Sequence, residues 1–251
     1  MRRVEWVHWK SLAMELFVVF VGLVAALQVD QWRQRRDLAE TETVYLHRLS
    51  EDLQGYIAYL KSAIPMLEEH RRAVAHVNDS FVAGQILRGD TALFESGLIF
   101  VAHLPSISRP RPAYDEMVAS GVFARLPPDL QRAVSELYAT QTTVESNFVW
   151  WRNQPIQVEE ALQPFVEYYS DGERVASTKY ALGSENRRIR YDFDQLRSQP
   201  VIRNGFYWAE DTHSDWVEWS NKLRELAETA AAAVTKELNG RQGAAYPARP
   251  Q

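Results

Sequence analysis

An apolar run near the N-terminus constrains this chain more than any other feature of its sequence. Residues 12–29 contain a single ionisable side chain, Glu15. At about 1.5 Å of rise per residue, a helix from Trp9 to Trp32 is roughly 34 Å long, close to a bilayer hydrocarbon core of about 30 Å plus the start of its headgroups. Trp6, Trp9 and Trp32 flank the run, and aromatic side chains prefer the membrane interface. The sequence therefore predicts a transmembrane helix over residues 12–29, surrounded by the lipid bilayer, with these three tryptophans as interfacial anchors.

Two other interpretations of the run stay open. A cleaved signal peptide would also start with basic residues such as Arg2 and Arg3 and would contain small residues such as Ala26. The basic and aromatic flank at residues 1–11, the carboxylate of Glu15 and the helical pattern that continues past Ala26 disfavour it. A helix lying in the membrane surface would need a wide polar face, which the run lacks.

The basic residues beside the run bear on its orientation. Three lysine or arginine residues lie on each side of it, and the free amine at the N-terminus adds a further positive charge. Because positive charge favours the cytoplasmic side, the sequence predicts a cytoplasmic N-terminus and a body outside the cytoplasm.

Glu15 shares one face of the expected helix with three later residues. Gly22, Ala26 and Val29 follow it at offsets that nearly complete whole helical turns. Small residues spaced like Gly22 and Ala26 let a second helix approach closely in lipid, and ionisable groups in membranes generally face protein or water. We therefore predict that Glu15, Gly22, Ala26 and Val29 form an association face for another membrane helix, from a second copy or a partner protein. The alternative is that Glu15 reaches back to the lipid headgroups or is simply protonated.

The same stretch carries a resemblance to a known family. Its spacing is E-x6-G-x3-A-L-Q-x3-W, and the matching residues are Glu15, Gly22, Ala26, Leu27, Gln28 and Trp32. Segments 113–138 and 191–206 are also similar to segments of the same family. The chain resembles a widespread family of uncharacterised bacterial single-pass membrane proteins, although Asp30 and Gln31 stand where asparagines are common. The resemblance implies a bacterial inner-membrane protein with a helical body, and it brings no catalytic residues with it.

Beyond the run, apolar residues recur every seven positions. The repeated positions and those three places later hold Leu46, Leu49, Leu53, Tyr56, Leu60, Ala63, Leu67, Val74, Val77 and Phe81. This pattern predicts a long helix that continues from the membrane span. Ile57 and Ile64 widen the apolar stripe, which favours an intramolecular bundle, while a two-stranded coiled coil stays open as the alternative. Pro65 is expected to kink or interrupt this helix.

The rest of the chain predicts further helices within a helical-bundle domain of residues 30–238. The expected elements are a short helix over 91–103, an irregular proline-rich loop up to 112, a helix over 113–120 closed by Gly121, a helix from Pro127 and Pro128 to Trp151, a loop or small hairpin over 170–199, a helix from Pro200 to Leu238 and a disordered tail over 239–251. The predicted fold class is all-α: an N-terminal transmembrane helix continuing into a long helix that packs in an antiparallel helical bundle.

Charge and composition exclude several classes of function. The chain has a net charge of −5; residues 1–36 hold six basic and three acidic residues, so the rest of the chain carries −8. An acidic body of this kind argues against nucleic acid as a partner, since nucleic-acid binding needs a concentrated basic surface. The chain has no cysteine, which excludes disulfides, thiolate metal sites and a cysteine nucleophile.

Glu210 and His213 form the most specific candidate for chemistry. Their E-x-x-H spacing is that of bundle-type di-iron carboxylate sites. Such a site needs the pair twice within the bundle, and the one other histidine with an acid three residues before it is His8, which follows Glu5 in the N-terminal flank. A salt bridge or a helix cap is therefore the favoured interpretation, and the sequence predicts no metal and no cofactor.

Aromatic residues near the C-terminus are mixed with acids. Phe206, Tyr207, Trp208, Trp216 and Trp219 lie among Glu210, Asp211, Asp215 and Glu218. Such a mixture could bind an organic cation, but the helical spacing favours a core stripe of aromatic residues with the acids on the solvated face.

Basic residues also gather at Arg187, Arg188 and Arg190, where they could meet phosphate, headgroups or an acidic partner, or form a solvated loop. No nucleophile elbow, P-loop or dinucleotide-binding motif is present. The sequence thus predicts a membrane-anchored, non-enzymatic binding, sensor-like or accessory module. The alternatives are a structural subunit assembled through the Glu15 face and, less favoured, a hidden metal-dependent enzyme.

Overall fold

Helices dominate the computed structural model, which describes residues 5–170 and 187–245, with side chains placed for 14–167 and 189–241. The elements are α1 (Glu5–Ala83), η1 (Leu87–Gly89), α2 (Thr91–Phe100), α3 (Pro112–Ala119), η2 (Phe123–Arg125), α4 (Pro128–Leu162), β1 (Val166–Ser170), β2 (Arg187–Tyr191), α5 (Phe193–Ser198) and α6 (Pro200–Ala245). The predicted all-α class is confirmed.

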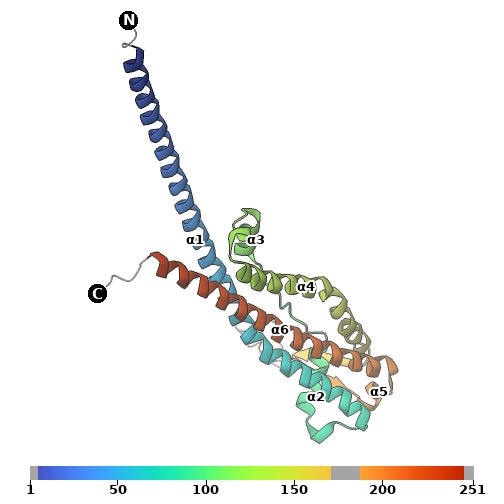
Figure 1. Ribbon diagram of the computed structural model, residues 1–251. Helices are drawn as coiled ribbons and strands as arrows, with labels where there is room; N and C mark the ends of the chain where they lie inside the picture. Colours follow the sequence, from blue (N-terminus) through green and yellow to red (C-terminus); the bar gives the residue numbers. More distant parts are fainter. Residues whose placement is uncertain (1–4, 171–186, 246–251) are drawn as a thin grey trace, which may run out of the picture.

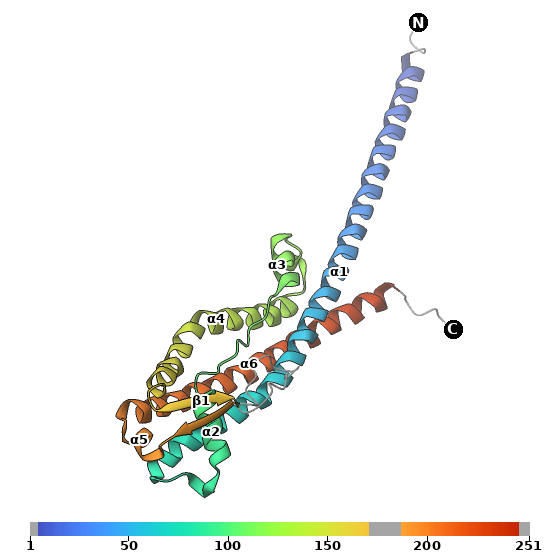
Figure 2. The same cartoon turned by 180° about the vertical axis from the view of Figure 1, so that it is seen from behind.

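The long helices α1 and α6 lie side by side and run in opposite directions (Figure 1). Nζ of Lys61 lies 3.0 Å from Oε1 of Glu228, and further along α1 the amide of Asn78 donates to Glu210 at 2.8 Å. Residue numbers therefore rise on one helix as they fall on the other. Helix α4 packs on α6, while α2 packs on α1. The N-terminal half of α1 projects beyond this body in both views (Figure 2).

The heptad seam of α1 forms the core of the bundle. Its buried members are Leu46, Leu49, Leu53, Tyr56, Leu60, Ala63, Leu67, Val74, Val77 and Phe81. The first part of the seam packs in a cluster with α4 and α6, and the last part packs with α2, α6 and the β-hairpin. Since the chain's own helices cover the seam, the intramolecular bundle predicted from the sequence is correct, and the seam is not open to a second copy.

Helix α1 continues without interruption through Pro65, contrary to the break that the sequence analysis allowed. The proline removes one backbone donor, and the carbonyl that loses its partner is that of Lys61. Both Pro65 and Lys61 lie on the exposed face of α1, where water can hydrogen-bond that carbonyl. The cost of the missing bond is therefore small compared with the burial of the seam on the opposite face.

Two helices extend further than predicted. Helix α4 passes Trp151 and Pro155 and ends at Leu162. Helix α6 ends at Ala245 instead of Leu238, so the expectation of a disordered tail from residue 239 is wrong for residues 239–245. The last turns of α6 are held by contacts between Arg241 and α1, described below, which a local sequence pattern does not reveal. Residues 246–251 lie outside the described part of the chain.

The expected excursion over residues 170–199 contains secondary structure at both ends. β1 and β2 pair in antiparallel register, with Val166 opposite Tyr191, and Oε2 of Glu167 accepts a hydrogen bond from Arg190 at 2.8 Å. The short helix α5 follows β2. Of the two sequence interpretations, the hairpin is thus the one that fits the paired strands, while residues 171–186 lie outside the described part.

Candidate functional site at the apolar helix and its junction

The N-terminal part of α1 has no packing partner within the described chain. Every described residue from Met14 to Glu40 is exposed, including large apolar side chains such as Phe17 and Phe20. One helix of the described residues, α1, is long and apolar enough to cross a membrane. Because so much contiguous apolar surface is unfavourable in water, this segment needs lipid or another protein around it.

The predicted association face is open along its whole length. Glu15, Gly22, Ala26 and Val29 are all exposed, and a Cβ placed on Gly22 would meet nothing within 4 Å. No other described element of the chain covers these residues. Their role in binding a second helix stays a prediction.

The interfacial anchors are only partly described. Trp32 is exposed, and the guanidinium carbon of Arg36 lies 5.8 Å from the centroid of its ring. Trp6 and Trp9 belong to α1, but their side chains lie outside the described part of the chain. Arg36 beside Trp32 places a cation and an aromatic ring together directly after the apolar run, as expected of an interface.

At the ideal 3.6 residues per turn, the open face and the buried seam lie on opposite sides of α1. Gly22 and Ala26 precede the buried Leu49 and Leu53 by 27 positions each, which is about 7.5 helical turns. The half turn left over points the small residues away from the body. A second helix could therefore lie against Gly22 and Ala26 without contacting the bundle that follows them in the same chain.

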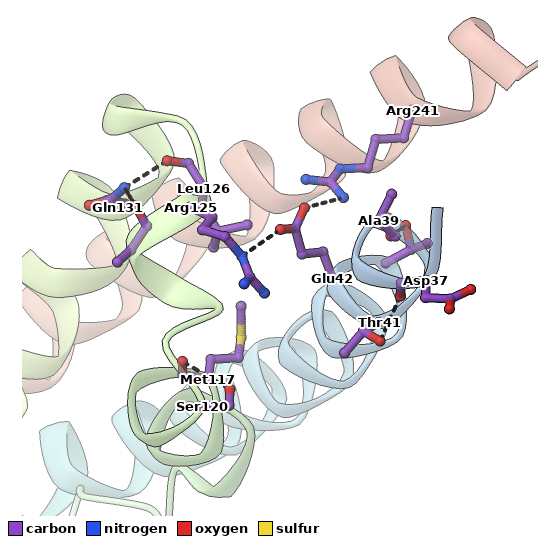
Figure 3. Close-up of polar contacts among 12 residues, drawn as sticks. Asp37, Ala39, Thr41, Glu42, Met117, Ser120, Arg125, Leu126, Gln131 and Arg241 are labelled. Carbon is purple, nitrogen blue, oxygen red and sulfur yellow. Dashed lines mark hydrogen bonds and ion pairs between the residues drawn. The ribbon is translucent and has the colours of Figure 1, made fainter. Parts of the chain in front are cut away.

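Glu42 marks the point at which α1 enters the body. Its carboxylate accepts from Nε of Arg125 at 3.0 Å and from Nη1 of Arg241 at 3.1 Å, and Arg241 also donates to Glu237 at 2.7 Å. Figure 3 shows Glu42 between the two guanidinium groups, which come from η2 and from the end of α6. The Glu42 side chain is 14% exposed. These contacts, the junction clasp, connect three segments at the end of the bundle nearest the apolar run.

The position of Glu42 explains why it needs two cations. It precedes Leu49 by seven residues and so continues the core stripe by one more heptad. A carboxylate at a core-facing position loses much of its hydration, and partial burial is tolerated only when opposite charges and hydrogen bonds replace the water. Sequence reasoning missed this residue, although the continued heptad was a signal that could have identified it.

A second ion pair supports the junction from α3. Arg48 donates two hydrogen bonds to the carboxylate of Glu116, at 2.6 and 2.9 Å, and this bonding lowers the pKa of Glu116. The backbone N–H of Ala113 donates to Asp52 at 3.2 Å. Both acceptors tie the segment around α3 to the first turns of the buried seam.

Glu210 and His213 do not converge on a common point. Glu210 accepts a hydrogen bond from Asn78, whereas Nε2 of His213 hydrogen-bonds the carbonyl oxygen of Val101 at 2.9 Å. Among the residues that the structure describes, no three histidine or acidic side chains are grouped as metal ligands. The pair serves helix packing; among the described contacts it forms neither the salt bridge nor the helix cap favoured above, because His213 is buried and bonds a backbone carbonyl.

The aromatic stretch of α6 is divided between core and surface. Trp216 is 1% exposed, donates to the carbonyl of Pro105 at 3.0 Å and packs against Phe148 and Trp151. Tyr207 and Trp208 are more than half exposed. The alternative of one aromatic cage is therefore wrong, because its largest ring is enclosed by α4.

The basic group at residues 187–190 lies in β2. Arg190 pairs with Glu167 on β1, and the side chains of Arg187 and Arg188 lie outside the described part.

Comparisons of the chain with protein-family models, with curated proteins and with solved structures found no match.

Proposed function

We propose that this chain is a single-pass membrane protein whose helical body acts as a binding, sensor-like or accessory module without catalytic activity. The continuity of α1 carries the proposal: one helix contains the open apolar run and, after a short exposed stretch, the buried seam of the bundle. A helix without a break transmits displacement or rotation between its two ends better than a flexible linker does. The junction clasp adds two further attachments where that helix meets the body.

The location that fits this proposal is the bacterial inner membrane, with the N-terminus in the cytoplasm and the body outside it. The resemblance of the Glu15–Trp32 motif and the charge around the run support it. The acidic body favours a protein or small-molecule ligand over nucleic acid.

Membrane extraction and a topology reporter test the anchoring. We expect the full chain to stay in the membrane pellet after alkaline carbonate and high salt, and to be released only by detergent. We also expect a C-terminal reporter that is active only outside the cytoplasm to show activity. Release by carbonate would contradict the span, and stoichiometric metal in the purified protein would contradict the non-enzymatic proposal.

A second candidate function is that of a structural subunit in a homo- or hetero-oligomeric membrane complex. The observation that favours it is the open face at Gly22 and Ala26, which no described element of the chain covers. Gly22→Leu should weaken crosslinking between neighbouring membrane helices, since a larger side chain separates the backbones. Val24→Leu, on the opposite side of the same helix, is the matched control. Equal crosslinking in both variants would count against this candidate.

A further inference from the structure

Three histidines from three parts of the chain lie close enough in the body to interact electrostatically. His70 lies on α1, His103 follows α2, and His213 lies on α6. The ring of His70 stacks on Phe100 with centroids 4.3 Å apart, and the ring of His103 lies 5.2 Å from that of His70. His70 and His213 are 5% and 1% exposed. We call these three residues the histidine cluster.

The cluster lies at one end of a segment that crosses α1 and α6. This segment, residues 101–107, is here called the strap. Its carbonyl oxygens accept hydrogen bonds from four buried or partly buried side chains: His213 to Val101 at 2.9 Å, Trp216 to Pro105 at 3.0 Å, Tyr59 to Ser106 at 2.5 Å and Tyr56 to Ile107 at 2.9 Å. All four donors lie on α1 or α6, so the strap holds the two helices together.

The imidazoles are bonded in a way that suits their neutral form. Because a carbonyl oxygen can only accept, Nε2 of His213 carries the hydrogen in its bond to Val101. Nδ1 of His213 and Nδ1 of His70 are buried without a hydrogen-bond partner among the described residues. A proton added at either Nδ1 would create a buried donor with no acceptor as well as a buried charge, and both are unfavourable.

The surroundings offer little compensation for such a charge. Burial lowers the pKa of His70 to about 3, and His103 and His213 lower it further, whereas a hydrogen bond that His70 donates to the backbone of His103 opposes this shift. Burial also lowers the pKa of His213 to about 4. The hydrogen bond to Val101 raises this pKa, and the nearby His103 lowers it. The titratable groups that act on these rings from α1, α6 and the strap are thus other imidazoles, and no carboxylate is among them. Glu210, one turn before His213, is engaged by Asn78.

We propose that the histidine cluster is an acid-sensitive latch, which keeps the strap on α1 and α6 at neutral pH and releases it as the pH falls below about 6. In the released state the imidazoles regain water and an ordinary pKa near 6.5. The latched state is therefore fully favoured above pH 6.5 and loses stability as the pH falls from 6.5 toward 4. The proposal goes beyond the proposed function and requires only the fold.

Amide hydrogen exchange of the full chain in lipid nanodiscs tests the latch. Protection factors are compared at pH 7.5 and pH 5.0 for peptides covering residues 100–108 and, as internal reference, for α4. Protonation of each imidazole can lower the equilibrium constant for the latched state over the released state by up to about tenfold per pH unit below 6.5. We expect the strap to lose at least about tenfold in protection at pH 5.0, while α4 keeps its protection.

Two substitutions remove the titration of the two buried imidazoles and keep one contact of each. His70→Phe preserves the stack on Phe100, and His213→Gln preserves a donor toward Val101. The double variant should show no acid-induced loss in the strap, whereas His47→Gln, at an exposed position of α1, should behave as the unmodified chain. If the double variant does not fold, His70→Phe alone should show a clearly reduced loss. Equal loss with and without these imidazoles, no loss at all, or equal loss in α4 would overturn the proposal.

Discussion

Gly97→Ala is the sharpest test of how the body is packed. Gly97 is buried in α2 where that helix crosses α1. A Cβ at this position would lie 2.5 Å from Cγ2 of Val77, 2.8 Å from the carbonyl carbon of Ala73 and closer still to the carbonyl oxygen of Ala73. Carbon atoms in van der Waals contact are about 3.5–4.0 Å apart, so the two helices would have to separate by roughly 1 Å.

The expected loss is the balance of two effects. Overpacking a core typically costs about 1–3 kcal/mol, and the upper end applies because the nearest atoms belong to the backbone of α1, which cannot rotate away. Alanine in place of glycine stabilises a helix by about 0.5–1 kcal/mol. We therefore expect Gly97→Ala to lower the free energy of unfolding of the body by about 2 kcal/mol.

Gly55→Ala is the matched control. Gly55 lies in the interior of α1, is exposed, and a Cβ there would meet nothing within 4 Å. This variant has the helix-propensity gain without the clash, so it should be more stable than the unmodified chain by about 0.5–1 kcal/mol. Urea unfolding of both variants in detergent, followed by far-ultraviolet circular dichroism, measures the difference. Equal stability of the two variants would refute the close packing of α2 on α1.

Two further substitutions test the junction and the membrane face. Glu42→Gln should destabilise the body by about 1–2 kcal/mol and speed amide exchange at the end of α6, because a charged hydrogen-bond acceptor is lost. The control is Glu40→Gln at an exposed position, whose stability should stay within about 0.5 kcal/mol of that of the unmodified chain. If the two variants behave alike in exchange and urea unfolding, the clasp does not stabilise the junction. Glu15→Gln should leave membrane insertion intact while altering association or stability, measured by carbonate extraction and crosslinking. An unchanged result in both would favour a Glu15 that reaches the headgroups.

Local patterns determined most of the helices but not their ends. Prolines and glycines positioned several boundaries well: Pro200 starts α6, Pro127 precedes α4, and Gly121 follows α3 with φ of +72°. An interruption at Pro65 and a helix end near Trp151 were the wrong expectations, since Pro65 and Pro155 both lie inside continuous helices. A proline stops a helix only when nothing else holds it, and here burial along α1 and α4 outweighs one lost hydrogen bond.

By itself, the sequence determined the apolar run, the heptad seam and the all-α class, because helical periodicity and hydrophobic burial are encoded by residues a few positions apart. Only the tertiary structure decided which polar groups meet. Arg241 and Glu42 are separated by 199 positions and His213 and Val101 by 112. Such pairs depend on how whole helices close on one another, and no local pattern carries that information. The seam and the place of Glu42 on it could be predicted, whereas the two arginine partners of Glu42 and the histidine cluster could not.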